Sequence, residues 1–354
     1  MKIGMMGAWN TASGAGVHAE LIGREWVRKG IDLKVFSFYD YSFHGKVFTT
    51  PPDKEESYVV RCFTKYGYPH PQLDTEAILK EDFDIFVVED LGMLPLKKLF
   101  SIYPEIRKRT KTVNIIHDGK LSEKSGFFDF DWDHVVCFDE RYNGFLKKIY
   151  PEETISIIPY PAASLVRGDK IEARKKLGLP QKKKIIFVFG QTAEKAAAIY
   201  PVLNRLNKKY DMLLVTVAKV ERTIEAFKNV ASELKFDLEI IEEAPDIERL
   251  YDYLHASDCT VYNKSSDPLV VVGSSIFQCM GSGCPIIALD SNFVHTLDKE
   301  VIRYRDEYEL ERSIIDVFEK GEKYQDQQSA IEAYLQENSA EHIAGKFIEL
   351  FEKL

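Results

Sequence analysis

Short apolar runs alternate with longer amphipathic stretches through most of the chain. The first run, Lys2–Met6, is followed by Val17–Lys29, whose apolar residues recur at helical spacing until Gly30. Further runs have the length and composition of buried strands: Leu33–Tyr39, Ile85–Val88, Val113–Ile116, Val135–Phe138 and Ile155–Ile158. Strands that alternate with helices predict a parallel sheet with right-handed crossovers.

The alternation stops at the stiff segment Pro159-Tyr160-Pro161 and then starts again. The second series of predicted strands is Lys183–Phe189, Met212–Val217, Leu238–Ile241, Cys259–Tyr262 and Ile286–Leu289. The pattern predicts an α/β protein with two doubly wound Rossmann-like domains, residues 1–160 and 161–335, followed by an amphipathic last helix within 336–354. Because ligands bind at the carboxyl ends of such strands, two domains that face each other would enclose a cleft.

Composition narrows the class of protein. The chain has 354 residues, of which 45% are hydrophobic and 29% charged, which is typical of a soluble globular protein of two domains. Its net charge of −9 argues against nucleic-acid binding. Five scattered cysteines lack zinc-ligand spacing, and we see neither a signal peptide nor a bilayer-spanning run. We therefore expect reduced thiols and a cytoplasmic location.

The stretch Asn263–Ala288 predicts a loop, a helix that begins near Gly273 or Ser274, a turn and a buried strand. Ser274 and Ser275 stand at the predicted helix start, where unpaired backbone N–H groups and the positive end of the helix dipole can bind phosphate. The alternative is that Ser274 is a plain N-cap.

The first predicted loop, Gly7–Gly16, is long and rich in small residues. We expect Gly14 and Gly16 to let a ligand approach the backbone closely. A purely structural turn is the alternative. GAGVHA also has a dinucleotide-binding spelling, but its first glycine lies too far beyond the strand for the tight turn that this motif requires.

Two further candidates follow predicted strands. His117 ends a strand at the edge where ligands bind and can hydrogen-bond a sugar hydroxyl, although a buried structural histidine is the alternative. Gly190 and Gln191 end the first strand of the second domain, and Lys195 follows them. The Lys195 ammonium could neutralise a diphosphate, unless it is a solvated surface lysine.

Other charged segments are weaker candidates. The acids of Asp82–Asp84 and Asp129–Asp133 favour turns and loops over metal sites. Lys97–Lys111 is basic with interleaved apolar residues, which suits contact with an anionic membrane or a lipid-linked acceptor. A solvated helix face is the simpler interpretation.

The order of these segments resembles that of family 4 glycosyltransferases. The opening KIGMMGAWNTASGAGVHAELIGREWVRKGIDLKVFSF resembles the family's first strand, glycine loop and helix. VNIIHDG, ARKKLGLPQKKKIIFVFGQTAEK and SSIFQCMGSGCPIIALD are similar to later segments, and ENSAEHIAGKFIELFEKL looks like the closing helix that packs back toward the first domain. The resemblance implies the GT-B fold, in which two Rossmann-like domains face each other across a cleft.

The resemblance also implies functional roles. His117 matches a histidine that contacts the donor sugar. Lys195 matches a positively charged residue that neutralises the leaving diphosphate, and Asp267 matches an acidic residue that contacts sugar hydroxyls. Gly14 and Gly16 match the loop near diphosphate and acceptor, while Gly190, Gln191, Ser274, Ser275 and Gln278 match the nucleotide site. The family usually has an arginine at Gln191 and a glutamate at Gln278, and its acid pair is spaced more closely than Asp267 and Gln278.

The sequence therefore predicts a retaining, metal-independent glycosyltransferase that needs no cofactor beyond its nucleotide diphosphate sugar. It would transfer a hexose-type sugar to a sugar, lipid-linked or small-molecule acceptor. The substitutions at Gln191 and Gln278 favour the alternative, a non-catalytic GT-B scaffold that binds a sugar nucleotide or a partner protein. A nicotinamide-dependent dehydrogenase, suggested by GAGVHA, is a third hypothesis.

Overall fold

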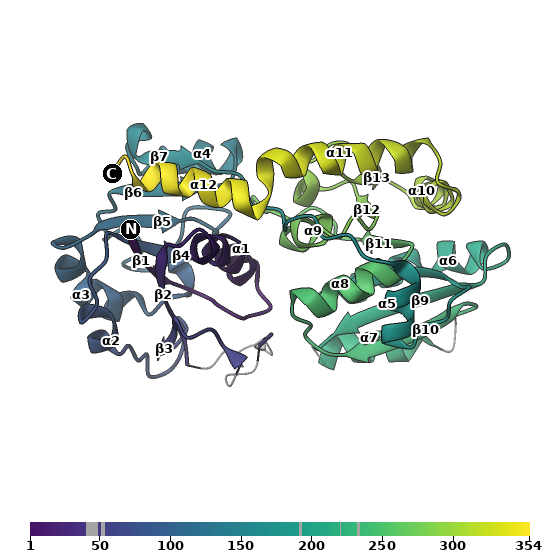
Figure 1. Ribbon diagram of the computed structural model, residues 1–354, viewed down its shortest axis with the longest axis horizontal. Coiled ribbons are helices and arrows are strands. Elements are labelled where there is room, and N and C mark those ends of the chain that lie inside the picture. The colour runs from purple at the N-terminus through teal and green to yellow at the C-terminus, as the bar shows by residue number, and fades with distance from the viewer. Residues whose placement is uncertain (40–48, 51–53, 191–192, 220, 232–233) are drawn as a thin grey trace. The chain divides into compact units, whose positions relative to one another are not determined.

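A computed structural model of the protein describes residues 1–39, 49–50, 54–190, 193–219, 221–231 and 234–354 (Figure 1). The chain forms two compact units. Unit 1 contains Met1–Pro161 together with Ala340–Leu354, and unit 2 contains Ala162–Ser339. Within the described ranges, no helix has both the length and the apolar character needed to cross a membrane.

Unit 1 is built on a seven-stranded sheet in the order β3-β2-β1-β4-β5-β6-β7, with every neighbouring pair parallel. Its strands are β1 Lys2–Met6, β2 Asp32–Phe38, β3 Val59–Phe63, β4 Ile85–Glu89, β5 Lys111–Ile115, β6 His134–Cys137 and β7 Ile155–Ile157. Its helices are α1 Gly14–Arg28, α2 Thr75–Leu79, α3 Leu96–Arg107, α4 Glu140–Leu146 and α12 Ala340–Phe351, with short 3-10 turns η2 Leu91–Met93 and η3 Glu152–Thr154.

Unit 2 has a parallel six-stranded sheet in the order β10-β9-β8-β11-β12-β13. Its strands are β8 Lys184–Phe189, β9 Met212–Ala218, β10 Asp237–Glu242, β11 Cys259–Tyr262, β12 Ile286–Leu289 and β13 Ile302–Tyr304. Its helices are α5 Lys170–Leu177, α6 Tyr200–Leu206, α7 Glu221–Val230, α8 Ile247–Ala256, α9 Ser274–Met280, α10 Glu307–Glu319 and α11 Glu322–Asn338, with 3-10 helices η4 Ala193–Ile199 and η6 Asn292–Val294. The predicted pair of doubly wound sheets is confirmed.

The apolar runs identified the central strands because those strands are buried on both faces. All five residues of β4 are buried, and so are all seven of β9. The apolar runs did not predict strands β3 and β13. Each lies at the edge of its sheet and carries an arginine, Arg61 or Arg303, within the run. An edge strand needs less burial, so its hydrophobic pattern is weaker.

Helix α3 covers most of the basic segment near Lys97. It turns Leu96, Leu99, Ile102, Tyr103 and Ile106 into the core and leaves its lysines exposed. Of the acidic segments, Asp84 accepts a hydrogen bond from the Lys2 backbone N–H, and Asp133 accepts two from Thr112. These acids therefore hold strand ends within unit 1.

The last helix packs on the first helix of the same unit. Figure 1 shows α12 in yellow beside α1 in purple, although they come from opposite ends of the chain. The buried Trp26 indole N–H donates to the Ala344 carbonyl at 3.1 Å, and its ring packs edge-on against Phe347 and Phe351. The chain terminus thus completes the core of unit 1.

We expect Phe347→Ala to lower the free energy of unfolding of unit 1 by about 3–5 kcal/mol, because Phe347 is fully buried and its loss leaves a cavity between α12 and α1. All three tryptophans, Trp9, Trp26 and Trp132, lie in unit 1, so urea unfolding followed by tryptophan fluorescence reports on this unit. The matched control is Phe100→Ala, at a ring 43% exposed. Equal losses for the two variants would contradict the packing role of Phe347.

Candidate functional site

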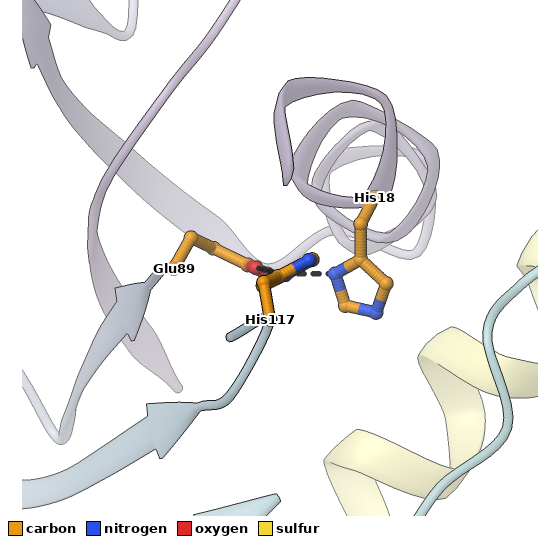
Figure 2. A group of neighbouring side chains, drawn as sticks. All are labelled: His18, Glu89 and His117. Atoms are coloured by element: carbon orange, nitrogen blue, oxygen red, sulfur yellow. Dashed lines mark hydrogen bonds and ion pairs between the residues drawn. The ribbon is translucent and has the colours of Figure 1, made fainter. Parts of the chain in front are cut away.

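The carboxyl ends of β4 and β5 bring together a carboxylate and two imidazoles. Glu89 is the last residue of β4, His117 follows β5 by two residues, and His18 lies in α1. The Glu89 Oε1 atom is 2.9 Å from Nδ1 of His18, and its Oε2 atom is 2.8 Å from Nε2 of His117. Figure 2 shows Glu89 reaching both rings, with dashed lines to each. The predicted site residue His117 therefore belongs to a three-residue cluster.

Local backbone structure places these side chains. The parallel pairing of β4 with β5 sets Glu89 opposite Ile115, just before His117. Gly7, directly after β1, allows close approach, because a Cβ at this position would lie 2.6 Å from the Glu89 Cβ. Helix α1 then begins at Gly14 with Ser13 as its N-cap, which carries His18 to the same edge of the sheet.

The cluster is almost completely removed from water. The side chains of Glu89 and His18 are fully buried, and that of His117 is 11% exposed. Burial opposes the charge of Glu89, but the two imidazoles that hydrogen-bond its oxygens outweigh this effect and lower the pKa of Glu89. Burial lowers the pKa of His18, and Glu89 offsets this only in part. The cluster therefore combines an ionised carboxylate with a neutral His18.

Aromatic rings surround His18. Its ring centroid lies 5.1 Å from that of Phe138, 5.2 Å from Tyr160 and 6.0 Å from Phe347. Within the part of the chain that the structure describes, its Nε2 atom is buried without a hydrogen-bond partner. Two imidazoles and a carboxylate with donor atoms within 4.8 Å of one another could also hold a metal ion. However, each nitrogen faces its own carboxylate oxygen at a normal hydrogen-bond distance.

The two predicted glycines of the first loop lie in the first turn of α1. The Gly14 carbonyl accepts a hydrogen bond from the Tyr160 hydroxyl at 2.7 Å. The Gly16 N–H donates to Ser13, and a Cβ on Gly16 would lie 2.4 Å from the Thr11 hydroxyl oxygen. Gly16 is therefore required for loop packing, and a ligand contact of either glycine stays a prediction.

In unit 2, the end of β8 lies beside the start of α9. Gly190 follows β8 with φ +110°, and among the described residues a Cβ built there would come within 4.0 Å of the Ser275 hydroxyl oxygen alone. Helix α9 begins at Ser274 and has Gly273 as its N-cap, without a side-chain cap. The interpretation of Ser274 as a plain N-cap is therefore wrong, and both serines belong to the first turn.

The other predicted residues of unit 2 lie on neighbouring loops. Lys195 is exposed in η4, and its carbonyl accepts a hydrogen bond from Asn263, which follows β11. The backbone N–H and carbonyl of Asp267 hydrogen-bond the side-chain amide of Asn292, and the Asp267 carboxylate accepts a hydrogen bond from the Leu269 N–H. Gln278 lies half-buried in α9, where its carbonyl accepts from Tyr251. Gln191 falls outside the described residues, so the candidates divide between His117 with the glycine loop in unit 1 and these residues in unit 2.

Sequence reasoning missed Glu89 and His18. The available signal for Glu89 was a lone carboxylate at the end of the otherwise apolar run IFVVE. His18 carried a weaker signal, because a histidine on the buried face of a helix is most often structural. Neither signal identifies its partner.

No protein-family model matches this chain. Among solved structures, HepE from Anabaena in complex with UDP and glucose is 15% identical, with a TM-score of 0.70 over 100% of both chains. A glycosyltransferase from Rickettsia africae is 17% identical, with a TM-score of 0.69 over 99% of this chain and 98% of that one. Sucrose-phosphate synthase from Thermosynechococcus elongatus is 13% identical, with a TM-score of 0.65 over 100% of this chain and 98% of that one. These similarities confirm the predicted GT-B fold.

We expect unit 1 to lose stability as the pH falls below about 6.5. A buried histidine with a lowered pKa stays neutral while the unfolded chain takes up a proton, which costs up to about 1.4 kcal/mol per pH unit. Glu89 adds to this loss only below about pH 4.5, as the pH falls toward its folded pKa. His18→Phe should therefore flatten the dependence between pH 6.5 and 4.5, measured by urea unfolding with tryptophan fluorescence.

The control for this prediction is His70→Phe, at an exposed position in the same unit, which should leave the slope unchanged. A slope that is the same in wild type and His18→Phe would show that His18 does not stay neutral in the folded protein.

Proposed function

We propose that this protein is a retaining glycosyltransferase that moves a hexose-type sugar from a nucleotide diphosphate sugar to a sugar, lipid-linked or small-molecule acceptor. The observation that carries the proposal is the GT-B fold, shared over nearly the whole chain with solved glycosyltransferase structures, one of them in complex with UDP and glucose. The polar residues at strand ends in both units support it, because ligands of such sheets bind at these ends.

Unit 2 would bind the nucleotide part of the donor. As far as the described residues show, Gly190 leaves space above the end of β8, next to the Ser275 hydroxyl and the first turn of α9. A diphosphate in this space would meet backbone N–H groups, the hydroxyls of Ser274 and Ser275, and the Lys195 ammonium. Gln278 would hydrogen-bond the ribose, and Asp267 the donor sugar.

The chemistry would proceed without a metal ion. In a retaining transfer, the bond to the leaving diphosphate breaks as the sugar takes on oxocarbenium character. Lys195 and the serine hydroxyls would stabilise the negative charge on the diphosphate, which is the role that a divalent cation would otherwise have. His117 would contact a hydroxyl of the donor sugar, and the loop with Gly14 and Gly16 would lie near the acceptor.

A non-catalytic GT-B scaffold is the second candidate. Gln278 favours it, because a neutral amide replaces the expected carboxylate and hydrogen-bonds a ribose hydroxyl less strongly. This candidate shares nucleotide binding with the first and lacks turnover, so a transfer assay separates the two.

We expect UDP, tested beside GDP and ADP, to stabilise the protein in a thermal-shift assay, by about 2.7 kcal/mol at a hundred times its Kd. Gly190→Ala should weaken the binding of that nucleotide at least about tenfold, because a Cβ would enter the space assigned to the diphosphate. Gly178→Ala is the matched control. Gly178 also has a positive φ, +71°, but ends α5, and it should bind nucleotide normally. Equal binding by both variants would remove Gly190 from the proposed site.

We expect His117→Ala to slow the release of UDP from the probe UDP-glucose about a hundredfold or more, because a polar contact to the reacting sugar is lost. The assay is run with EDTA present, since the proposal needs no divalent cation. His134→Ala, which removes a histidine bonded to Ser156 in the same sheet, should retain turnover. Turnover by His117→Ala at the wild-type rate would contradict the assignment, and a loss of wild-type turnover in EDTA would contradict metal independence.

A further inference from the structure

The hydrogen bonds around Glu89 determine where protons sit on two histidines. An ionised carboxylate only accepts hydrogen bonds, so each imidazole nitrogen that faces it must carry a proton. Since Oε1 faces Nδ1 of His18 and Oε2 faces Nε2 of His117, the protons are on these two nitrogens. An imidazole whose single proton is on Nε2 has a lone pair on its other nitrogen, Nδ1.

We propose that Glu89 is a positioning residue that holds His117 in the Nε2–H tautomer, so that Nδ1 accepts a hydrogen bond from a hydroxyl of the substrate. This inference rests on the proposed function, in which His117 contacts the donor sugar. It adds the direction of that hydrogen bond and names the residue that sets it.

The position of Glu89 restricts its carboxylate to contacts within the cluster. Its side chain is fully buried at the end of β4, and Gly7 lies against its Cβ. The His117 ring packs edge-on against Phe138 at 4.9 Å and against His18 at 5.2 Å. Among the described residues the ring has Glu89 as its one hydrogen-bond partner, and 11% of the side chain is exposed. Glu89 therefore holds the His117 ring at Nε2, and a small part of the side chain is accessible to solvent.

His18 engages the second oxygen of the carboxylate. Without it, the buried Oε1 would lose this hydrogen bond, which is unfavourable for a charged group. The Nε2 atom of His18 is itself buried and unpartnered, so this imidazole has no route to a ligand among the described residues. We therefore assign the substrate contact to His117 alone.

An isosteric change at Glu89 separates proton position from shape. Glutamine has one oxygen and one NH₂ group, so Glu89→Gln can accept from one imidazole but must donate to the other. The imidazole that receives this N–H must move its own proton to its far nitrogen. For His18 this would place an N–H among aromatic rings without an acceptor, whereas His117 is partly exposed to water. We expect the tautomer to change at His117.

The test is side-chain NMR of protein labelled with ¹⁵N-histidine, in which one-bond and two-bond couplings identify the protonated nitrogen of each ring. The His117 signals are assigned by their loss in His117→Gln. We expect His117 to be Nε2–H in the wild type, in Glu89→Asp and in His18→Phe, because each of these keeps a carboxylate facing the ring. We expect the Nδ1–H form in Glu89→Gln.

Three outcomes would overturn the proposal. One is an Nδ1–H form of His117 in the wild type, which needs no variant to be detected. The second is a Glu89→Gln protein in which only His18 changes. The third is a stoichiometric divalent ion, found by elemental mass spectrometry of the purified protein, with both facing nitrogens metal-bound and unprotonated.

A turnover assay tests whether the tautomer of His117 matters for the reaction of the substrate. We expect Glu89→Gln to release UDP from UDP-glucose about a hundredfold more slowly, and Glu89→Asp to recover part of this loss. A changed tautomer with unchanged turnover would overturn the proposed hydrogen bond. If the wild type neither binds nor turns over UDP-glucose, the proposed function fails on that result, while the NMR experiment still decides whether Glu89 sets the tautomer.

Discussion

A carboxylate buried completely in protein must be paired, and this requirement organises the first unit. Glu89 ends a central strand at a place where no water reaches its side chain. An unpaired charge in such a position would be strongly destabilising, so the chain supplies an imidazole for each oxygen. One imidazole comes from α1 and the other from the loop after β5. A single side chain thus ties helix α1 to two neighbouring strands at the edge of the sheet where ligands bind.

The environment of that carboxylate depends on the whole unit. Phe347 comes from the last helix and Phe138 follows β6, and together they exclude water from the His18 ring. Because water is absent, the hydrogen bonds to Glu89 are stronger and proton positions are better defined than they would be at a surface. The C-terminal helix therefore contributes to the electrostatics of the candidate site as well as to the core. The candidate site in unit 2 is built differently. It consists of the space beside the Gly190 backbone and the start of a helix, with no buried charge like Glu89 among its described residues.

Sequence identity of 13–17% to the similar structures is compatible with the same fold because the fold depends on pattern more than on particular residues. The alternation of buried strands with amphipathic helices predicted the central strands of both sheets. The edge strands β3 and β13 were lost, since Arg61 and Arg303 interrupt short apolar runs. For the site, the sequence placed candidates at strand ends in both units. It also placed Ser274 at the start of α9, where the structure excludes the alternative of a plain N-cap.

The sequence by itself determined two doubly wound domains, because strand and helix periodicities are local properties of a chain. It also placed His117 at the carboxyl end of a strand for the same reason. Only the tertiary structure decided that His117 has Glu89 as its partner and that Glu89 has a second partner in His18, 71 residues away. Pairing across such a separation depends on strand order in the sheet and on where α1 crosses it. Residue spacing along the chain determines neither the strand order nor the position of α1, so the proton positions follow only from the tertiary structure.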